Sequence, residues 1–561
     1  MRSERQLSRI VPAAPAALAA LALALGGCGS SSHPSGTEAD PATAVPAAAP
    51  AYVGATVRPS GSQQSAAEAA GKGLTGSPDP YARLLGLLRT PGSPPLDYQR
   101  EVAPWLGPRA GLFAGSLRSA EALIGPLASS LTGSGAIAAL QFSSGGLDGA
   151  LVMDTSDAGA ARSFLATQAK RAGAHASSYR GVSYEVSPGG VAFGLVGRFA
   201  VIGSEAGLRG VIGATQGEAA LSSTPGYAKL ASSAPSEAIA HLYVNPAAGA
   251  PHGSGQSLLE AIAGSRPTYA ALTLASSSLR LDVDSLAGGA SGLLAPDPQA
   301  AQALSQLPGE SWLALGIGHA GTHLAGAAAA LSGLSSLTGS ESAGGTLSLG
   351  GLLGGLTQPL RILGARTPAA RRDFASWMGP AGIFAAGSGV LELRAGVVIS
   401  STNATSSRAA VAKLGARLRA AGNEVSSATI PGTDAAIAVR LPGLPLILNV
   451  ASGSSPSGPK FILGLGEASV TTALSPSSTM SASSARSAAS SALGEGIEPS
   501  VIADFPTLLA LLEGVGLTED PTVSSLLPYL RASKTLVGGG RTLEGGVERF
   551  RLVLALRSAG G

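Results

Sequence analysis

Two stretches of the chain show the same change of pattern, in which a short apolar run gives way to helical periodicity. Residues 150–154 and 396–400 are mainly apolar, as in a buried strand, and a polar segment follows each of them. Apolar residues then recur three or four positions apart, which predicts an amphipathic helix in each case. They are Ala161, Phe164, Leu165, Ala169 and Ala172 in the first helix, and Val411, Leu414, Leu418 and Ala421 in the second.

Glycine and β-forming residues predict where these helices end and where strands begin. Gly173 and Gly422 stand where a helix favours a glycine after its last turn. A first strand is expected in "APAYVGATVRP" at 49–59, and further strands are expected around Tyr184 and Ile437. A helix is expected after each of the strands "FAVIG" and "FILG".

The strands are expected to connect mainly as hairpins. Gly197-Arg198 marks a tight turn between Val191–Val196 and Phe199–Ile202, whereas Ser452–Pro459 predicts a longer loop at the corresponding place. Late strands are predicted at Tyr269–Leu274, Leu279–Val283, Thr535–Val537 and Phe550–Leu556. The expected fold class is therefore α+β, with mainly antiparallel sheets that helices cover on one face.

The elements recur because the sequence contains an internal repeat. "PWLGPRAGLFAG" (104–115) parallels "SWMGPAGIFAAG" (376–387), and "FAVIGSEAGLRGVIGA" (199–214) parallels "KFILGLGEASVTTALS" (460–475). The matching segments keep their order at a spacing of about 260 residues. We therefore predict two homologous α+β repeats, the first at 51–295 and the second at 300–561.

Two segments of the second repeat lack this pattern. Residues 318–358 carry almost no charge and are rich in Gly, Ala, Leu and Ser, which favours a buried or amphipathic helix over a membrane span. Residues 476–492 are dominated by Ser and Ala and predict a solvated inserted loop.

The N-terminal segment has the features of an export signal. Three arginines precede an apolar stretch that ends at Leu25, and two glycines follow it. The sequence Leu25-Gly26-Gly27-Cys28 resembles the lipobox of bacterial lipoproteins. That resemblance implies lipidation of the Cys28 thiol and cleavage between Gly27 and Cys28, which makes 1–27 a signal peptide and leaves a protein anchored to the outer face of the cell membrane.

Composition narrows the possible partners. Loss of residues 1–27 removes three arginines and one glutamate, so the net charge of +3 falls to +1. With no basic run interleaved with aromatic residues, nucleic acid is excluded as an expected partner. The small polar residues of 28–50 predict a flexible tether between the lipid and the first repeat. Cys28 is the only cysteine, which excludes an intramolecular disulfide.

Several motifs suggest chemistry that their context does not support. His319 and His323 lie four residues apart, but no acidic residue stands nearby to complete a metal site. Gly464-Leu465-Gly466 lacks the third glycine of a dinucleotide-binding loop, and we interpret it as a helix start. Its counterpart at 203–207 offers Ser204 and Glu205 for helix capping.

Three further residues have both a functional and a structural interpretation. Trp105 and Trp377 occupy the same place in the two repeats and could form a ligand platform, but packing under a turn is favoured. Asn403 lies in a glycosylation-like sequon and is expected to cap a helix. A Ser/His/Asp triad that uses His241 stays open, because triad members need not be adjacent in sequence.

Four segments of the first repeat carry a family likeness. They are "DPATAVPAAAPAYVGATVRPSG" (40–61), "DYQREVAPWLGPRAGLFAG" (97–115), "SYRGVSYEV" (178–186) and "GRFAVIGSEAGLRGVIGATQGEAALSSTPGYAKL" (197–230). Through them the first repeat resembles the bacterial family catalogued as domain of unknown function 3352, found in exported actinobacterial proteins. The resemblance implies architecture and export, and it implies no activity.

The sequence thus predicts a lipid-anchored envelope protein with a non-catalytic binding or structural role. It has no predicted catalytic, metal or cofactor residues, and its expected partners are the membrane, through Cys28, and an envelope protein or an apolar ligand. The alternative is a carrier for a lipid or another apolar ligand, which the uncharged 318–358 region favours. A serine-type hydrolase is the third hypothesis.

Overall fold

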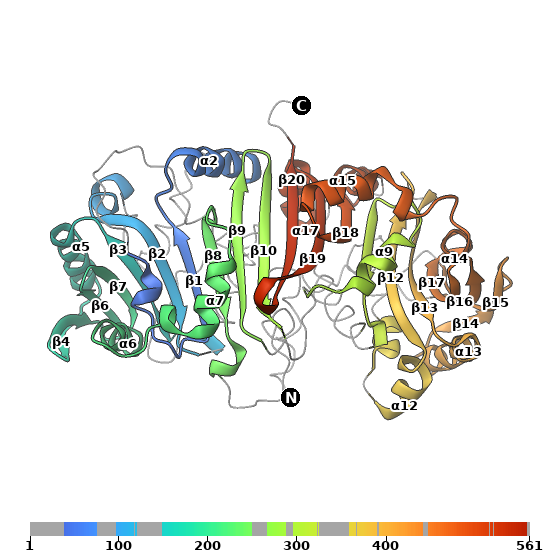
Figure 1. The fold of residues 1–561 in the computed structure, drawn as a ribbon, viewed down its shortest axis with the longest axis horizontal. Helices are drawn as coiled ribbons and strands as arrows, with labels where there is room; N and C mark the ends of the chain where they lie inside the picture. The colour runs from blue at the N-terminus through green and yellow to red at the C-terminus, as the bar shows by residue number, and fades with distance from the viewer. Residues whose placement is uncertain are drawn as a thin grey trace. The chain divides into compact units, whose positions relative to one another are not determined.

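The computed structural model describes most of the chain after the N-terminal segment (Figure 1). The described residues are 39–75, 97–116, 118–119, 148–249, 266–287, 295–321, 324, 358–365, 367–389, 392–440, 447–514, 516–519 and 521–557. The predicted signal peptide, Gly27, Cys28, His323 and nearly all of the 318–358 segment lie outside these residues.

The chain forms two compact units. The N-terminal unit holds the described residues up to 287 together with Leu543–Arg549, and the C-terminal unit holds those of 295–542 together with Phe550–Arg557. Each unit combines helices with an antiparallel sheet, so the α+β fold class is confirmed.

The sheet of the N-terminal unit has the order β4-β5-β6-β7-β3-β2-β1-β8-β9-β10. Neighbouring strands are antiparallel, and three of the connections are tight hairpins. The strands are β1 (Ala51–Thr56), β2 (Leu106–Ala114), β3 (Gly149–Thr155), β4 (His175–Tyr179), β5 (Val182–Val186), β6 (Val191–Val196), β7 (Phe199–Ser204), β8 (Ala240–Val244), β9 (Thr268–Ala275) and β10 (Ser278–Leu286).

The sheet of the C-terminal unit has the same order of strands, β14-β15-β16-β17-β13-β12-β11-β18-β19-β20. The strands are β11 (Leu313–Ile317), β12 (Met378–Ala386), β13 (Arg394–Ser401), β14 (Glu424–Ser427), β15 (Thr433–Arg440), β16 (Ile447–Ser455), β17 (Gly458–Leu465), β18 (Glu498–Asp504), β19 (Ser533–Leu543) and β20 (Val547–Leu556). Its ladders from β14 to β19 are antiparallel as well.

Helices and single helical turns connect the strands. In the N-terminal unit these are η1 (Pro41–Thr43), α2 (Gly61–Thr75), η2 (Tyr98–Val102), α5 (Ala158–Arg171), α6 (Glu205–Thr215), η3 (Leu221–Ser223), α7 (Pro225–Ser233), η4 (Pro246–Gly249) and the turn η9 (Glu544–Gly546). In the C-terminal unit they are α9 (Pro298–Ser305), α12 (Pro368–Ala370), η5 (Arg371–Ala375), α13 (Ala404–Ala420), α14 (Glu467–Leu474), η7 (Met480–Ala482), α15 (Ser484–Leu493), α16 (Phe505–Gly514), η8 (Leu517–Glu519) and α17 (Pro521–Ala532).

Helices cover both faces of the sheet of the C-terminal unit, and not one face as the sequence predicted. Alternate residues of β17 point to opposite sides, so Phe461 and Leu463 pack in the cluster that contains α13. Ile462 packs in the other cluster, with residues of α9, α14 and α15. Burial on both faces explains why this strand is almost continuously apolar.

The helix termini follow the sequence signals. Asn403 caps α13 by accepting a hydrogen bond from the Ser406 amide, and Ser204 caps α6 in the same way through Gly207. Gly173 and Gly422 follow the C-caps of α5 and α13 with φ of +64° and +90°, where a side chain would strain the backbone. These predictions are confirmed.

The two equivalent tryptophans are packed and not displayed. Trp105 and Trp377 are each 1% exposed, and each indole Nε1 donates to the carbonyl four residues earlier, at 2.7 and 3.0 Å. Each ring lies against a phenylalanine, Phe164 or Phe461. The packing interpretation is confirmed over that of a ligand platform.

Three expectations about flexible segments are wrong. The tether predicted to reach residue 50 ends earlier, because Ala42, Ala44, Val45 and Ala49 are buried in the core of the N-terminal unit. The segment 476–492 forms η7 and most of α15 in place of a solvated loop. Its small side chains allow close packing, as at Ala489, which is buried.

The prediction of a longer loop at Ser452–Pro459 is also wrong. Strands β16 and β17 run on to a two-residue turn at Pro456-Ser457, where Ser455 pairs with Gly458. The extra residues therefore lengthen the hairpin and do not loosen its turn.

A buried ion pair joins the last segment of the N-terminal unit to its sheet. Arg549 donates from Nε and Nη2 to the two carboxylate oxygens of Asp284, at 2.7 and 2.8 Å. Asp284 also accepts from the Ser233 hydroxyl at 2.7 Å. Both charged side chains are almost completely buried, so each depends on the other for compensation.

We expect Arg549→Met to lower the free energy of unfolding of the N-terminal unit by about 3–5 kcal/mol, because Asp284 would stay buried without its cation. Urea denaturation followed by circular dichroism measures this change. Arg100→Met is the control, since Arg100 pairs with Asp97 on the surface. This substitution should leave the midpoint of urea unfolding unchanged. Equal effects of the two substitutions would contradict the prediction.

Candidate functional site

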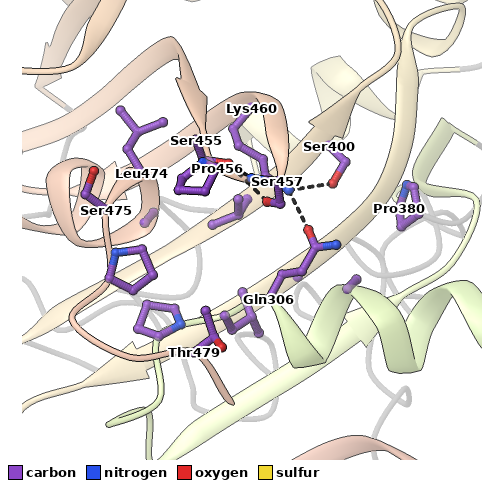
Figure 2. A pocket seen from close by; sticks show the side chains of 17 residues that line it. Gln306, Pro380, Ser400, Ser455, Pro456, Ser457, Lys460, Leu474, Ser475 and Thr479 are labelled. Atoms are coloured by element: carbon purple, nitrogen blue, oxygen red, sulfur yellow. Dashed lines mark hydrogen bonds between the residues drawn. The ribbon is translucent and has the colours of Figure 1, made fainter. Parts of the chain in front are cut away.

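A pocket of about 260 Å³ opens in the C-terminal unit between the β16–β17 hairpin, the end of α9 and the segment that follows α14 (Figure 2). Its apolar wall is formed by small and branched side chains, and polar side chains line the rest. The apolar residues are Ala303, Leu307, Pro308, Pro380, Val398, Pro456, Ala473, Leu474 and Pro476, and the polar ones are Gln306, Ser400, Ser455, Ser457, Lys460, Ser475 and Thr479.

Lys460 is the one charged side chain among the residues that line this pocket. It lies on β17 and, like Ile462 two residues later, points to the face of the sheet that α9, α14 and α15 cover. Only 4% of Lys460 is exposed there. Its ammonium nitrogen donates to Gln306 Oε1 at 2.6 Å and to Ser400 Oγ at 2.9 Å (Figure 2). Both acceptors are neutral, so within the described residues no carboxylate balances this buried cation.

Strand pairing and a helix end position these three residues. Ser400 of β13 is directly opposite Lys460 of β17 in the antiparallel ladder. Gln306 is the C-cap of α9, an eight-residue helix that begins at the Asp297 N-cap. The C-terminal end of a helix carries partial negative charge, which favours a nearby cation.

The contacts of the lysine fix which groups remain for a ligand. An ammonium only donates, so the oxygen of the Gln306 amide must face it. The amide NH₂ of Gln306, the hydroxyl hydrogen of Ser400 and the third N–H of Lys460 are then donors with no bond assigned in the described structure. The pocket therefore presents donors around a positive charge.

Burial also changes the titration of this lysine. Loss of contact with water lowers the pKa of Lys460 below its ordinary value of 10.5, because desolvation disfavours the charged form. An anionic ligand would favour the protonated form and gain a charge-assisted hydrogen bond.

A second polar cluster lies in the N-terminal unit. The His241 ring stacks on Tyr269 with the centroids 4.9 Å apart, and its Nε2 is 3.3 Å from the Tyr227 hydroxyl. Burial lowers the pKa of His241 to about 4, so the ring is neutral at physiological pH. The rings of His241 and Tyr52 fill the space over Gly54, so this cluster is packed core.

The hypothesis of a Ser/His/Asp triad gains no support from the described histidines. His241 has aromatic neighbours, and His319 pairs with Asp297 at 3.0 Å on the surface. The sequence has many serines, but among the described ones none forms a hydrogen bond with His241, whose ring nitrogen lies next to the Tyr227 hydroxyl.

The glycine-rich turn at Gly464-Leu465-Gly466 starts a helix, as expected. Gly466 is the N-cap of α14 with φ of +76°, and Ser469 returns a hydrogen bond to the Leu465 carbonyl. No group of three or more metal-ligating side chains occurs among the described residues, and no described helix is both long and apolar enough to span a membrane.

Sequence analysis missed Lys460. The signal was present, because "KFILG" aligns with "FAVIG" in the repeat and so sets Lys460 against Phe199. A lysine at the edge of an apolar strand is usually solvent-exposed, and only the pairing with β13 shows that it points inward.

Comparison with known proteins gives one family. The profile of the family described as Protein of unknown function (DUF3352) matches residues 16–437. Neither the curated proteins nor the solved structures give a match. The matched segment contains Gln306 and Ser400, whereas Lys460 follows it.

We expect Lys460→Met to raise the free energy of unfolding at pH 7 by on the order of 1 kcal/mol, because a buried cation is replaced by an apolar chain. The depressed pKa means that the wild-type penalty is present at neutral pH and fades as pH rises toward 10.5. The gap between variant and wild type should therefore narrow at pH 10 in urea titrations.

Lys413→Met is the matched control. Lys413 is half-exposed on α13 and pairs with Asp373 at 2.9 Å. Lys413→Met should therefore not raise the free energy of unfolding. A destabilised Lys460→Met protein at pH 7 would show that this lysine is a structural residue.

Proposed function

The chain belongs to the DUF3352 family of proteins of unknown function, and we propose that it is a lipid-anchored binding protein of the cell envelope. Its C-terminal unit binds a small organic anion in the Lys460 pocket. The observation that carries the proposal is the buried lysine, which donates to two neutral oxygens at the wall of a pocket and has no carboxylate partner among the described residues.

The sequence supports export and anchoring. The run of arginines, the apolar stretch and the ending Leu25-Gly26-Gly27-Cys28 form a lipoprotein signal. The single cysteine of the chain then serves for attachment. A thioether-linked lipid with further acylation gives stable anchoring without a membrane-spanning segment.

The two units are homologous repeats that have diverged. The identical strand order supports this proposal, as does the agreement of their registers. Gly54 pairs with Gly111 in one unit and Gly316 pairs with Gly382 in the other. In each unit an isolated β-bridge also joins the segment before the first strand to the segment after α6 or its counterpart α14, through Pro46–Ala220 or Pro308–Thr479.

The size of the pocket limits the ligand. Pockets for drug-sized molecules measure roughly 300–1,000 Å³, so about 260 Å³ suits a smaller molecule. This disfavours a carrier for a whole membrane lipid, and the lysine disfavours a purely apolar ligand. The hydrolase hypothesis gains no support from the described histidines, of which His241 lies among aromatic rings and His319 pairs with Asp297.

Anchoring is tested by Cys28→Ala in the host cell. We expect the wild type to sediment with membranes and the variant to be released, because the variant has no thiol to lipidate. Globomycin should make the unprocessed wild-type precursor accumulate. A Cys28→Ala protein that stays in the membrane fraction would contradict the proposal.

Binding is tested by isothermal titration calorimetry with a panel of small organic carboxylates, phosphonates and sulfonates. We expect at least one anion to bind the wild type and to bind Lys460→Met at least tenfold more weakly, because the charge-assisted hydrogen bond is lost. Lys413→Met should bind like the wild type. Failure of every anion, or equal binding by all three proteins, would overturn the proposed function.

A further inference from the structure

We propose that the ligand of this pocket is a monocarboxylate with a short apolar group, and that its carboxylate lies against Lys460 and Ser400. This inference rests on the proposed function and specifies the chemical class of the ligand. The inference is drawn from a comparison of the two units, because the N-terminal unit has a carboxylate of its own at the position equivalent to Ser400.

The registers of the two sheets define that position. Val152 pairs with Val201 in the N-terminal unit, and Val398 pairs with Ile462 in the C-terminal unit. Two residues along, Asp154 pairs with Phe199, and Ser400 pairs with Lys460. Asp154 and Ser400 are therefore equivalent, as are Phe199 and Lys460.

In the N-terminal unit a cation and an anion are both supplied by the chain. Asp154 is completely buried, and its Oδ1 accepts from Arg198 Nε and Nη2 at 2.7 Å. Burial raises the pKa of Asp154, and the hydrogen bond from Arg198 opposes that shift. The equivalent of Arg198 is Pro459, so the C-terminal unit cannot form this pair.

In the C-terminal unit the cation has moved by one residue and the anion is absent. Lys460 replaces Phe199, which removes an apolar ring from the core face and introduces an ammonium. Ser400 replaces Asp154, which removes the carboxylate and leaves a neutral hydroxyl at 2.9 Å from Lys460. A carboxylate brought by a ligand would restore the charge balance that the N-terminal unit has internally.

Two further differences lie beside Lys460. Gln306 is equivalent to Ala44, since Val45 and Leu307 accept corresponding hydrogen bonds from Leu221 and Met480, and it supplies the amide that contacts the lysine. The β16–β17 hairpin is also longer, so that Gly453, which has no side chain, is opposite Lys460, whereas Val196 is opposite Phe199 in the N-terminal unit.

The charge of the site favours a monoanion. One ammonium lines the pocket, and the nearest helix end is the carbonyl end of α9, which repels a second negative charge. Phosphate groups are usually bound by arginines or by helix N-termini. A carboxylate has two oxygens that accept hydrogen bonds, and Lys460, Ser400 and the Gln306 amide can donate to them.

The apolar wall of the pocket favours an apolar group at the end of the ligand opposite its carboxylate. Leu307 and Val398 are among the apolar residues that line the pocket. Leu474 lines it as well, while Ser455 and Ser457 lie at the turn of the hairpin (Figure 2). Contact with the apolar wall strengthens binding as methylene groups are added. The volume of about 260 Å³ then sets an upper limit to that series.

The test is a calorimetric titration of the full mature chain with acetate, butyrate, hexanoate and benzoate. Butyramide, methylphosphonate and inorganic phosphate are the comparison probes. We expect the dissociation constant to fall from acetate to butyrate, and butyramide and the phosphorus anions to bind at least tenfold more weakly than butyrate.

Two substitutions at one position make the test specific. Ser400→Asp supplies the missing carboxylate within the chain and should weaken butyrate binding at least tenfold while raising the midpoint of urea unfolding. Ser400→Asn has nearly the shape of the aspartate without its charge, so any loss of binding in Ser400→Asn measures steric obstruction and the missing hydroxyl, and Ser400→Asp should bind butyrate at least tenfold more weakly than Ser400→Asn does. This pair separates charge compensation from steric obstruction.

Each result decides a different point. Lys460-dependent binding of phosphonate or sulfonate without any carboxylate would overturn the ligand class and leave the proposed function intact. Equal binding of butyrate and butyramide, or equal loss of binding in Ser400→Asp and Ser400→Asn, would overturn recognition of charge. Absence of binding by every anion would overturn the proposed function as well.

Discussion

The register of the antiparallel ladders determines which side chains share the buried faces of each sheet. A shift of one residue in β17 would move Lys460 from the face covered by α9, α14 and α15 to the face covered by α13. Phe461 would move in the opposite direction. Because both faces are covered by helices, no strand residue near the centre of the sheet can avoid burial. The charge state of Lys460 and the packing of Trp377 against Phe461 both depend on this register.

The two units share a strand order, but their cores differ at one place. The Asp154–Arg198 pair and the ring of Phe199 occupy this place in the N-terminal unit. The C-terminal unit has neither the carboxylate nor the ring there and has a buried cation instead, and a buried cation without a carboxylate partner tends to lower stability. Natural proteins retain such features where they serve binding, so the more strained of two equivalent sites is the better candidate for function.

The sequence predicted those features that depend on neighbouring residues. Caps at Asn403 and Ser204, glycines after α5 and α13 and the β6–β7 hairpin all follow from local backbone chemistry. Burial of residues 42–49 and the helix at 484–493 did not follow, because alanine and serine are as common in loops as in close packing. Whether such a segment is buried depends on the partner surface, which is distant in sequence. Lys460 was missed for the same reason, since its strand partner Ser400 lies 60 residues away.

A small pocket with one cation can discriminate between ligands through desolvation. Any molecule that enters must lose water from its polar groups, and only an anion regains that energy from Lys460 and its two neighbours. A neutral amide loses hydration without an equivalent gain, and a dianion keeps one uncompensated charge beside the carbonyl end of α9. Selectivity therefore requires no large complementary surface. A sheet whose strands are packed on both faces fixes the backbone of Lys460, and the hydrogen bonds to Gln306 and Ser400 hold its ammonium at the wall of the pocket.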